Sequence, residues 1–206
     1  MKPILILYAT REGQTRRIAE HIASTIQARS REARIVDVAA APPELALADY
    51  GTVILAASVH MGKHEREMER FVREHRQALE QVPTIFLSTS MTEAAAEIGS
   101  NTAERRELAH AETERMIEEF FTRTGFHATA HKAVAGALRY TQYNWLIRLI
   151  MKRISKSEGG STDTSRDHEY TDWVDLDRFI IETLLSGQQA DPPLPVATAP
   201  NTQPGC

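Results

Sequence analysis

The sequence has 206 residues, of which 42% are hydrophobic and 25% charged, and its formal net charge is −4. This composition is typical of one folded domain with a short appendage, and it excludes a strongly basic nucleic-acid-binding protein. No run approaches the roughly 20 apolar residues that a membrane-spanning helix needs. The single cysteine, Cys206, excludes a disulfide framework within one chain, so we expect a protein of the cytoplasm.

Apolar runs bounded by turn residues predict five β-strands, at residues 4–8, 34–38, 52–57, 84–88 and about 127–135. Helical spacing of apolar residues predicts helices over residues 15–29, 65–80, 102–122 and 171–185. The first and third strand runs show no polar alternation, as in parallel strands that are buried on both faces. Strands that alternate with helices predict a doubly wound α/β fold around a parallel sheet.

Two segments do not fit the minimal α/β pattern. Residues 138–168 form an insert between the fifth strand and the last helix, so we expect one domain over residues 1–186 that carries this insert. Residues 187–206 are rich in Pro, Gln, Ala and Thr. Because this tail has few large apolar side chains to offset the cost of ordering, we expect it to be disordered.

The loop after the first strand has the composition of a phosphate site. It contains hydroxyl groups, a glycine and the start of a helix, in the order Thr10, Arg11, Glu12, Gly13, Gln14 and Thr15. Backbone N–H groups of such a turn point at an anion, and Gly13 permits close approach. The loop is neither a dinucleotide fingerprint nor a Walker loop, so it suits one terminal phosphate. The alternative is an ordinary strand-to-helix turn with a threonine cap.

Ligands of doubly wound sheets bind beyond the carboxyl ends of the strands. The loops that follow the third and fourth strands, residues 58–64 and 88–92, are therefore expected to lie beside the first loop. They are polar or rich in small residues and contain no aromatic side chain. We therefore predict that all three loops border one binding site. His60 and His64 are too isolated to predict a metal site.

The charge of the insert differs in sign from that of the whole chain. Residues 139–156 include five basic residues and no acidic one, although the whole chain is acidic. Helical spacing places Arg148, Lys152 and Lys156 on one face, and a basic amphipathic helix that begins near Trp145 is typical of a membrane-surface element. The alternative is a helix that packs on its own sheet and leaves a basic edge in solvent. Tyr140 could stack on a planar ligand or pack in a core.

Three stretches of the chain resemble a known family. They are residues 9–16 (ATREGQTR), residues 135–140 (AGALRY), and residues 159–164 (GGSTDT) followed by Tyr-Thr-Asp-Trp at 170–173. The first resembles the phosphate loop of flavodoxin-like proteins. Together the three resemble the flavodoxin-like, quinone-coupled protoporphyrinogen oxidases of bacterial haem synthesis, over residues 1 to about 186. The resemblance implies a flavodoxin-like sheet of five parallel strands with the insert before the last helix.

The resemblance also implies FMN as cofactor, a porphyrinogen as substrate and a membrane quinone as electron acceptor. The cofactor contacts that it implies are Thr10, Arg11, Glu12, Gly13, Gln14, Thr15, Ser58, Val59, His60, Met61, Gly62, Ser88, Thr89, Ser90, Met91, Gly136, Leu138, Arg139 and Tyr140. The insert residues expected to meet the substrate or an anionic membrane are Trp145, Arg148, Leu149, Lys152, Arg153 and Lys156. The protein would then be peripheral on the inner face of the cell membrane.

Two other functions fit the same residues. A flavodoxin-like electron carrier would have no substrate of its own, and we would expect an acidic docking face in place of the basic insert. An NAD(P)H:quinone reductase would take its electrons from a nicotinamide. No second nucleotide motif is visible for the nicotinamide, although a shared flavin face would not need one.

Overall fold

The computed structural model describes residues 1–99, 101–138, 140–141, 152, 156, 161 and 163–186. Its central sheet has the order β2-β1-β3-β5-β6, and all neighbours on this path are parallel. These strands span Ile4–Ala9 (β1), Ala33–Asp37 (β2), Thr52–His60 (β3), Thr84–Ser90 (β5) and Ala130–Ala135 (β6). The five-stranded parallel sheet and the flavodoxin-like order predicted from the sequence are confirmed.

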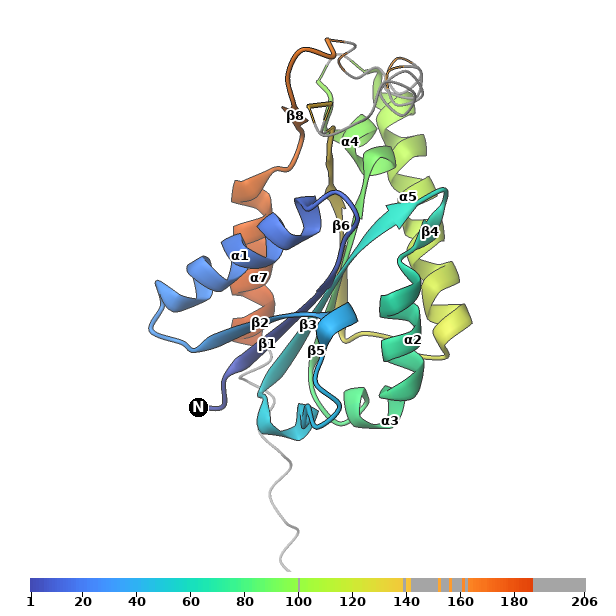
Figure 1. The fold of residues 1–206 in the computed structure, drawn as a ribbon. Coiled ribbons are helices and arrows are strands. Elements are labelled where there is room, and N and C mark those ends of the chain that lie inside the picture. The colour runs from blue at the N-terminus through green and yellow to red at the C-terminus, as the bar shows by residue number, and fades with distance from the viewer. Residues whose placement is uncertain are drawn as a thin grey trace, which may run out of the picture.

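Helices cover both faces of the sheet (Figure 1). One face carries α1 (Gln14–Gln27) and α7 (Trp173–Ser186), and the other carries α2 (Arg66–Glu74), α3 (Arg76–Leu79) and α5 (Ala103–Thr124). Side chains of a strand alternate between faces. Ile4 and Ile6 accordingly join the core under α1 and α7, while Leu5 and Leu7 join the core under α2 and α5. Burying each such side chain contributes roughly 1.5–3 kcal/mol.

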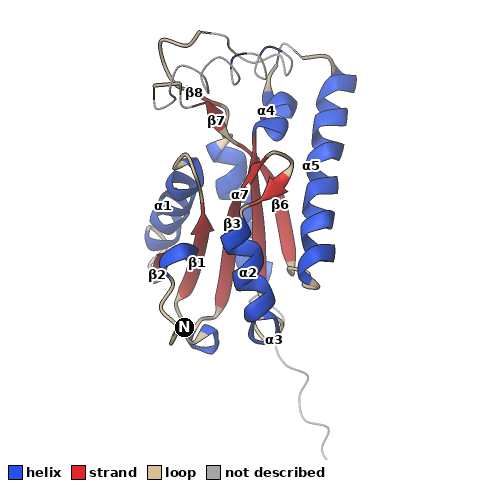
Figure 2. Cartoon of the chain, turned by 45° about the vertical axis from the view of Figure 1, so that its right-hand side comes forward, coloured by secondary structure: helices blue, strands red, loops and turns tan. Residues whose placement is uncertain are grey.

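The elements missing from the sequence prediction are short. They are the 3-10 turns Val38–Ala40 and Leu47–Asp49, the strand β4 (Lys63–His64), the helix α4 (Met91–Glu97) and the strands β7 (Ala137–Leu138) and β8 (His168–Glu169). The single helix expected over residues 65–80 is two helices, α2 and α3, that meet at His75. Of these elements, β4, α4, β7 and β8 lie at the carboxyl end of the sheet, as Figure 2 shows for α4, β7 and β8.

Candidate functional site

The loop after β1 ends at Gly13, which adopts a left-handed backbone conformation that favours glycine. Gly13 has φ +82°, and its N–H donates to the Thr10 hydroxyl over 3.0 Å. It occupies the N-cap position of α1, where the first hydrogen bond within the helix runs from Arg17 N–H to the Gly13 carbonyl. No side chain of the described residues caps this end of α1, so its opening N–H groups lack the usual side-chain acceptor.

Thr15 gives the clearest indication of a ligand site. Its side chain is fully buried in the first turn of α1, and its hydroxyl has no hydrogen-bond partner in the described part of the chain. Buried hydroxyl groups without partners are rare because they lose their bonds to water. A phosphate at the α1 N-terminus would accept from this hydroxyl and from the open N–H groups together. The residues present therefore fit the phosphate of a flavin.

We expect replacement of Thr15 by Val to affect stability and binding differently. The apoprotein should be as stable as the parent or more so, because the change removes an unsatisfied polar atom. Flavin affinity should fall about tenfold to a hundredfold, since a hydrogen bond to a charged group is worth roughly 1.5–3 kcal/mol. Flavin fluorescence titration and thermal unfolding of the apoprotein measure the two effects.

The matched control is Thr113→Val on α5. Thr113 is equally buried, but its hydroxyl donates to the Ala109 carbonyl over 3.1 Å. This variant should leave flavin affinity unchanged. A Thr15→Val protein that binds the flavin phosphate as tightly as the parent would contradict the phosphate assignment.

The second predicted loop is a β-hairpin that extends β3 beyond the sheet. Val59 pairs with His64 and His60 with Lys63, so Met61 and Gly62 form a two-residue turn. Both turn residues have positive φ, 51° and 74°, as a type I′ turn requires. The Met61 side chain is 90% exposed at the tip. The structure thus presents a flexible thioether where the loop lacks an aromatic ring.

Glu65 joins this hairpin to the phosphate loop. The side chain is 5% exposed, and one carboxylate oxygen accepts from Arg11 Nε over 3.0 Å. The other oxygen accepts from the Ser58 hydroxyl over 3.1 Å. Two of the predicted loops are therefore held together by a buried carboxylate that the sequence analysis did not single out.

The third predicted loop directs its hydroxyl groups to different partners. Ser88 is buried, and its hydroxyl lies 2.9 Å from His64 Nε2. Ser90 caps α4, because its hydroxyl accepts from Glu93 N–H over 2.9 Å. Thr89 is 4% exposed, and its hydroxyl has no partner among the described residues. Of these three side chains, Thr89 is therefore the one whose hydroxyl is available for a hydrogen bond to a ligand.

His64 is a neutral core residue in this structure. Its ring lies edge-on to Phe86 and Phe120, with ring centroids 5.2 and 5.0 Å away. Burial, with a smaller contribution from the charge of Arg123, lowers the pKa of His64 to about 3. The imidazole therefore stays uncharged at neutral pH and positions the Ser88 hydroxyl.

The two ends of the insert meet in a small antiparallel pair. Ala137 pairs with Glu169 and Leu138 with His168, which forms the β7–β8 sheet. Gly136 N–H donates to the Ser90 carbonyl over 2.8 Å, and a Cβ at Gly136 would lie 3.2 Å from that oxygen. A glycine therefore lets the end of β6 pass close to the end of β5.

The Tyr140 side chain packs in the interior at the base of the insert. Its side chain is fully buried, and its hydroxyl donates to the Ser161 carbonyl over 3.1 Å. Ser161 N–H donates in turn to the Tyr170 hydroxyl over 3.0 Å. Of the two alternatives weighed from the sequence, the structure places Tyr140 in a core, and its ring offers no open face to a planar ligand.

The insert base is also tied to the phosphate loop. Gln14 Nε2 donates to the Glu169 carboxylate over 2.7 Å and to the Thr171 hydroxyl over 3.0 Å. Arg17 donates to the same carboxylate over 2.9 Å, and the Thr171 hydroxyl donates to the Ala135 carbonyl over 2.7 Å. The helix that begins at the phosphate loop and the exit strand of the insert therefore share one polar network.

Most of the predicted insert residues lie outside the described part of the chain. These are Arg139, Trp145, Arg148, Leu149 and Arg153. Lys152 and Lys156 are described, and both are helical and exposed. The predicted tail, residues 187–206, also lies outside the described residues. No described helix is both long and apolar enough to traverse a lipid bilayer.

The sequence of the chain is similar to those of known proteins. A family model for the flavodoxin domain matches residues 5–165. The chain is 31% identical over 178 residues to protoporphyrinogen IX dehydrogenase (quinone) of Escherichia coli K12. The aligned region covers 86% of this chain and 92% of that protein. It is 30% identical over 176 residues to the protein of the same name from Leishmania major, which covers 85% of this chain and 71% of that protein.

Solved structures share the fold. A flavodoxin from the domain Archaea gives a TM-score of 0.50 at 13% identity and covers 90% of this chain and 99% of its own. A short-chain flavodoxin associated with a non-canonical PDU bacterial microcompartment gives a TM-score of 0.52 at 11% identity, over 91% of this chain and 99% of its own. At these identities the likeness establishes the arrangement of strands and helices.

Proposed function

Since this chain belongs to the flavodoxin domain family, and within it to the protoporphyrinogen IX dehydrogenases (quinone), we propose that it is an FMN-dependent oxidoreductase of haem biosynthesis. It oxidises protoporphyrinogen IX to protoporphyrin IX and passes the electrons to a membrane quinone, menaquinone or ubiquinone. The observation that carries the cofactor assignment is the buried Thr15 hydroxyl at the N-terminus of α1, where neither this hydroxyl nor the helix end has a side-chain partner among the described residues.

FMN is favoured because the cradle suits a single phosphate. Thr10 to Thr15 would hold it through Gly13, the opening N–H groups of α1 and the Thr15 hydroxyl. The Met61 hairpin and Thr89 border the space beyond the strands, where the ring system would lie. The bound flavin supplies the two-electron redox chemistry, so the protein's task is to bind, orient and control access.

Arg11 contributes charge as well as position. Glu65 fixes the Arg11 Nε, and the Arg11 side chain remains 55% exposed beside the phosphate loop. A guanidinium held there favours a dianionic phosphate over a neutral group. This arrangement supports FMN over riboflavin as the cofactor.

A quinone acceptor requires approach to the bilayer, and we assign that role to the insert. Lys152 and Lys156 are four residues apart, so both lie on one side of a helix, and both are exposed. Each basic residue near an anionic membrane surface contributes about 1 kcal/mol at low salt. The protein would act from the cytoplasm as a peripheral protein on the inner face of the cell membrane.

Anaerobic reduction tests the function directly. The FMN-loaded protein is mixed without oxygen with protoporphyrinogen, NADH or NADPH, and loss of flavin absorbance is followed. We expect rapid reduction by protoporphyrinogen alone, followed by reoxidation on adding a quinone. Rapid reduction by a nicotinamide would identify an NAD(P)H:quinone reductase. Reduction by none of the three would identify an electron carrier, and either result would reject the proposal.

A further inference from the structure

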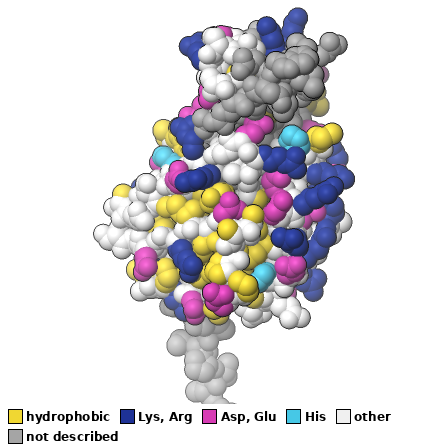
Figure 3. All heavy atoms as spheres, in the orientation of Figure 1, with side chains coloured by type: hydrophobic (Ala, Val, Ile, Leu, Met, Phe, Trp, Pro, Cys, Tyr) yellow, Lys and Arg dark blue, Asp and Glu magenta, His cyan; other side chains and the backbone are white. Residues whose placement is uncertain are grey.

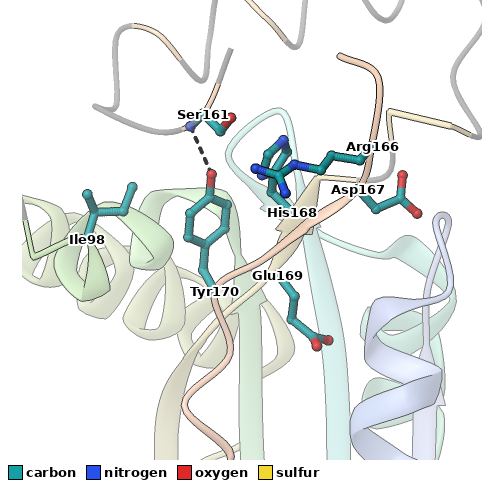
Figure 4. Close-up of a pocket in the computed structure, with 7 residues that line it drawn as sticks. All are labelled: Ile98, Ser161, Arg166, Asp167, His168, Glu169 and Tyr170. Atoms are coloured by element: carbon teal, nitrogen blue, oxygen red, sulfur yellow. Dashed lines mark hydrogen bonds between the residues drawn. The ribbon is translucent and has the colours of Figure 1, made fainter. Parts of the chain in front are cut away.

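A pocket lies between the C-terminal end of α4 and the strand β8 (Figure 4). Its volume is 380 Å³, and it is lined by Ile98, Ser161, Arg166, Asp167, His168, Glu169 and Tyr170. Pockets for small ligands span roughly 300–1,000 Å³. This pocket is therefore large enough for one side of a bulky ligand but not for the whole of it.

His168 and Glu169 are neighbours in β8, so their side chains fall on opposite faces of the strand, and Arg166 lies in the bend that precedes it. Figure 4 shows the Asp167 and Glu169 carboxylates directed away from the His168 ring.

Both carboxylates already have partners outside the pocket. Asp167 accepts from the Thr141 N–H over 2.9 Å and from the Thr141 hydroxyl over 2.8 Å. Glu169 accepts from Gln14 and Arg17, over 2.7 and 2.9 Å. Asp167 and Glu169 are thus both hydrogen-bonded to residues outside the lining, whereas the Arg166 guanidinium is the basic group of the lining.

The Arg166 guanidinium has N–H donors available for a ligand. Its side chain is 74% exposed, and its Nε pairs with the Asp163 carboxylate over 3.2 Å. Within the described residues, the two terminal nitrogens of Arg166 have no partner. His168 Nε2 donates to the Asp163 carbonyl over 2.8 Å, which fixes the ring. Asp163 therefore contacts both Arg166 and His168 from one side.

The remaining walls are less polar. Ile98 closes the C-terminal end of α4, and the Tyr170 ring lies opposite with its hydroxyl engaged by Ser161 N–H. A ligand that fits this lining has a carboxylate next to a short hydrocarbon or aromatic part. Phosphate alone would leave the apolar walls without a contact.

The pocket borders the proposed flavin region on two sides. The helix α4 begins at Met91, directly after Ser90, and its seven residues span about 10 Å up to Ile98. The strand β8 contacts the phosphate-loop helix through Glu169 and Gln14. A planar molecule over the flavin could therefore place an outer arm in this pocket.

We propose that this pocket binds a propionate arm of the porphyrinogen, with the carboxylate on the Arg166 guanidinium and the adjoining pyrrole edge against Ile98 and Tyr170. The inference rests on the proposed function and adds a specificity determinant to it. Arginines of α2 and α5 contribute to the dark blue patch on the right of Figure 3. Among them, Arg73 and Arg123 pair with Glu69 and Arg115 pairs with Glu112, so these three are poorer candidates.

Binding of the product provides a test that does not depend on turnover. Fluorescence titration compares protoporphyrin IX with its dimethyl ester, in the FMN-loaded parent and in Arg166→Gln, Arg166→Lys and Arg178→Gln. Arg178 is the matched control, because it is 60% exposed and pairs with an acidic residue three positions earlier, as Arg166 does. The FMN content of each variant is measured first.

We expect the parent to bind the diacid about tenfold more tightly than the ester, from one charge-assisted contact. Arg166→Gln should lose that preference, Arg166→Lys should retain part of it, and Arg178→Gln should match the parent. An Arg166→Gln protein that keeps the full preference, or a parent that has none, overturns the inference. If the parent oxidises porphyrinogen in the anaerobic assay, either result leaves the proposed function standing. If it does not, the function fails whatever the pocket binds.

Discussion

Replacement of Gly13 by Val is expected to lower FMN affinity about a hundredfold or more. Gly13 has φ +82°, a conformation in which a β-branched residue is strained, so the chain must rotate at this position. Rotation would break the bond from Gly13 N–H to Thr10 and turn the start of α1 away from the phosphate. Left-handed strain of roughly 1–2 kcal/mol and a lost charge-assisted bond of similar size together give this factor.

The control separates strain from site chemistry. Gly125 has φ +67° at the C-terminal end of α5, and a Cβ there would meet only the flexible end of Arg76, at 3.1 Å. Gly125→Val should therefore lower the thermal stability by a similar amount and leave FMN affinity unchanged. Flavin titration and thermal unfolding of both variants measure this. Equal loss of FMN affinity in both would mean that Gly13 acts through stability alone.

The parallel sheet was predictable because its signal is local and strong. Residues 4–8 and 52–57 are apolar at every position or nearly so, and only a strand buried on both faces requires that pattern. The alternation of such strands with helices then restricts the topology to a few folds. The split between α2 and α3 at His75 was missed, because the apolar spacing continues across it to Leu79.

The loops of the site were predictable in position but not in their connections. Strand ends of a parallel sheet meet at one edge, so loops 10–15, 58–64 and 88–92 could be grouped from the sequence. Glu65 and Glu169 could not be identified, since an acidic residue that is buried or tied to a distant loop looks like any surface carboxylate in a sequence. The β7–β8 pair was also invisible, because a two-residue strand has no measurable period.

Replacing residues 142–160 by a short Gly-Ser linker is expected to abolish electron transfer from porphyrinogen to membrane quinone while leaving a folded, FMN-binding protein. The hydrogen bonds of Tyr140 with Ser161 and of Ser161 with Tyr170 hold the two ends of this segment together. A short linker can therefore bridge them, and closing a shorter loop costs little. The phosphate loop and the Gln14–Glu169 contact remain.

Vesicle co-sedimentation shows which role the replaced segment has. The parent should bind anionic vesicles at 0.1 M salt and release them at 1 M, because the screening length falls from about 10 Å to about 3 Å. The linker variant should bind neither anionic nor neutral vesicles. A matched variant with Lys152 and Lys156 both changed to Gln should show weaker, less salt-dependent binding and unchanged FMN affinity. If vesicle binding by the parent does not depend on lipid charge or salt, the basic residues serve the substrate instead. If the linker variant keeps full activity with membrane quinone, the segment has no part in electron transfer.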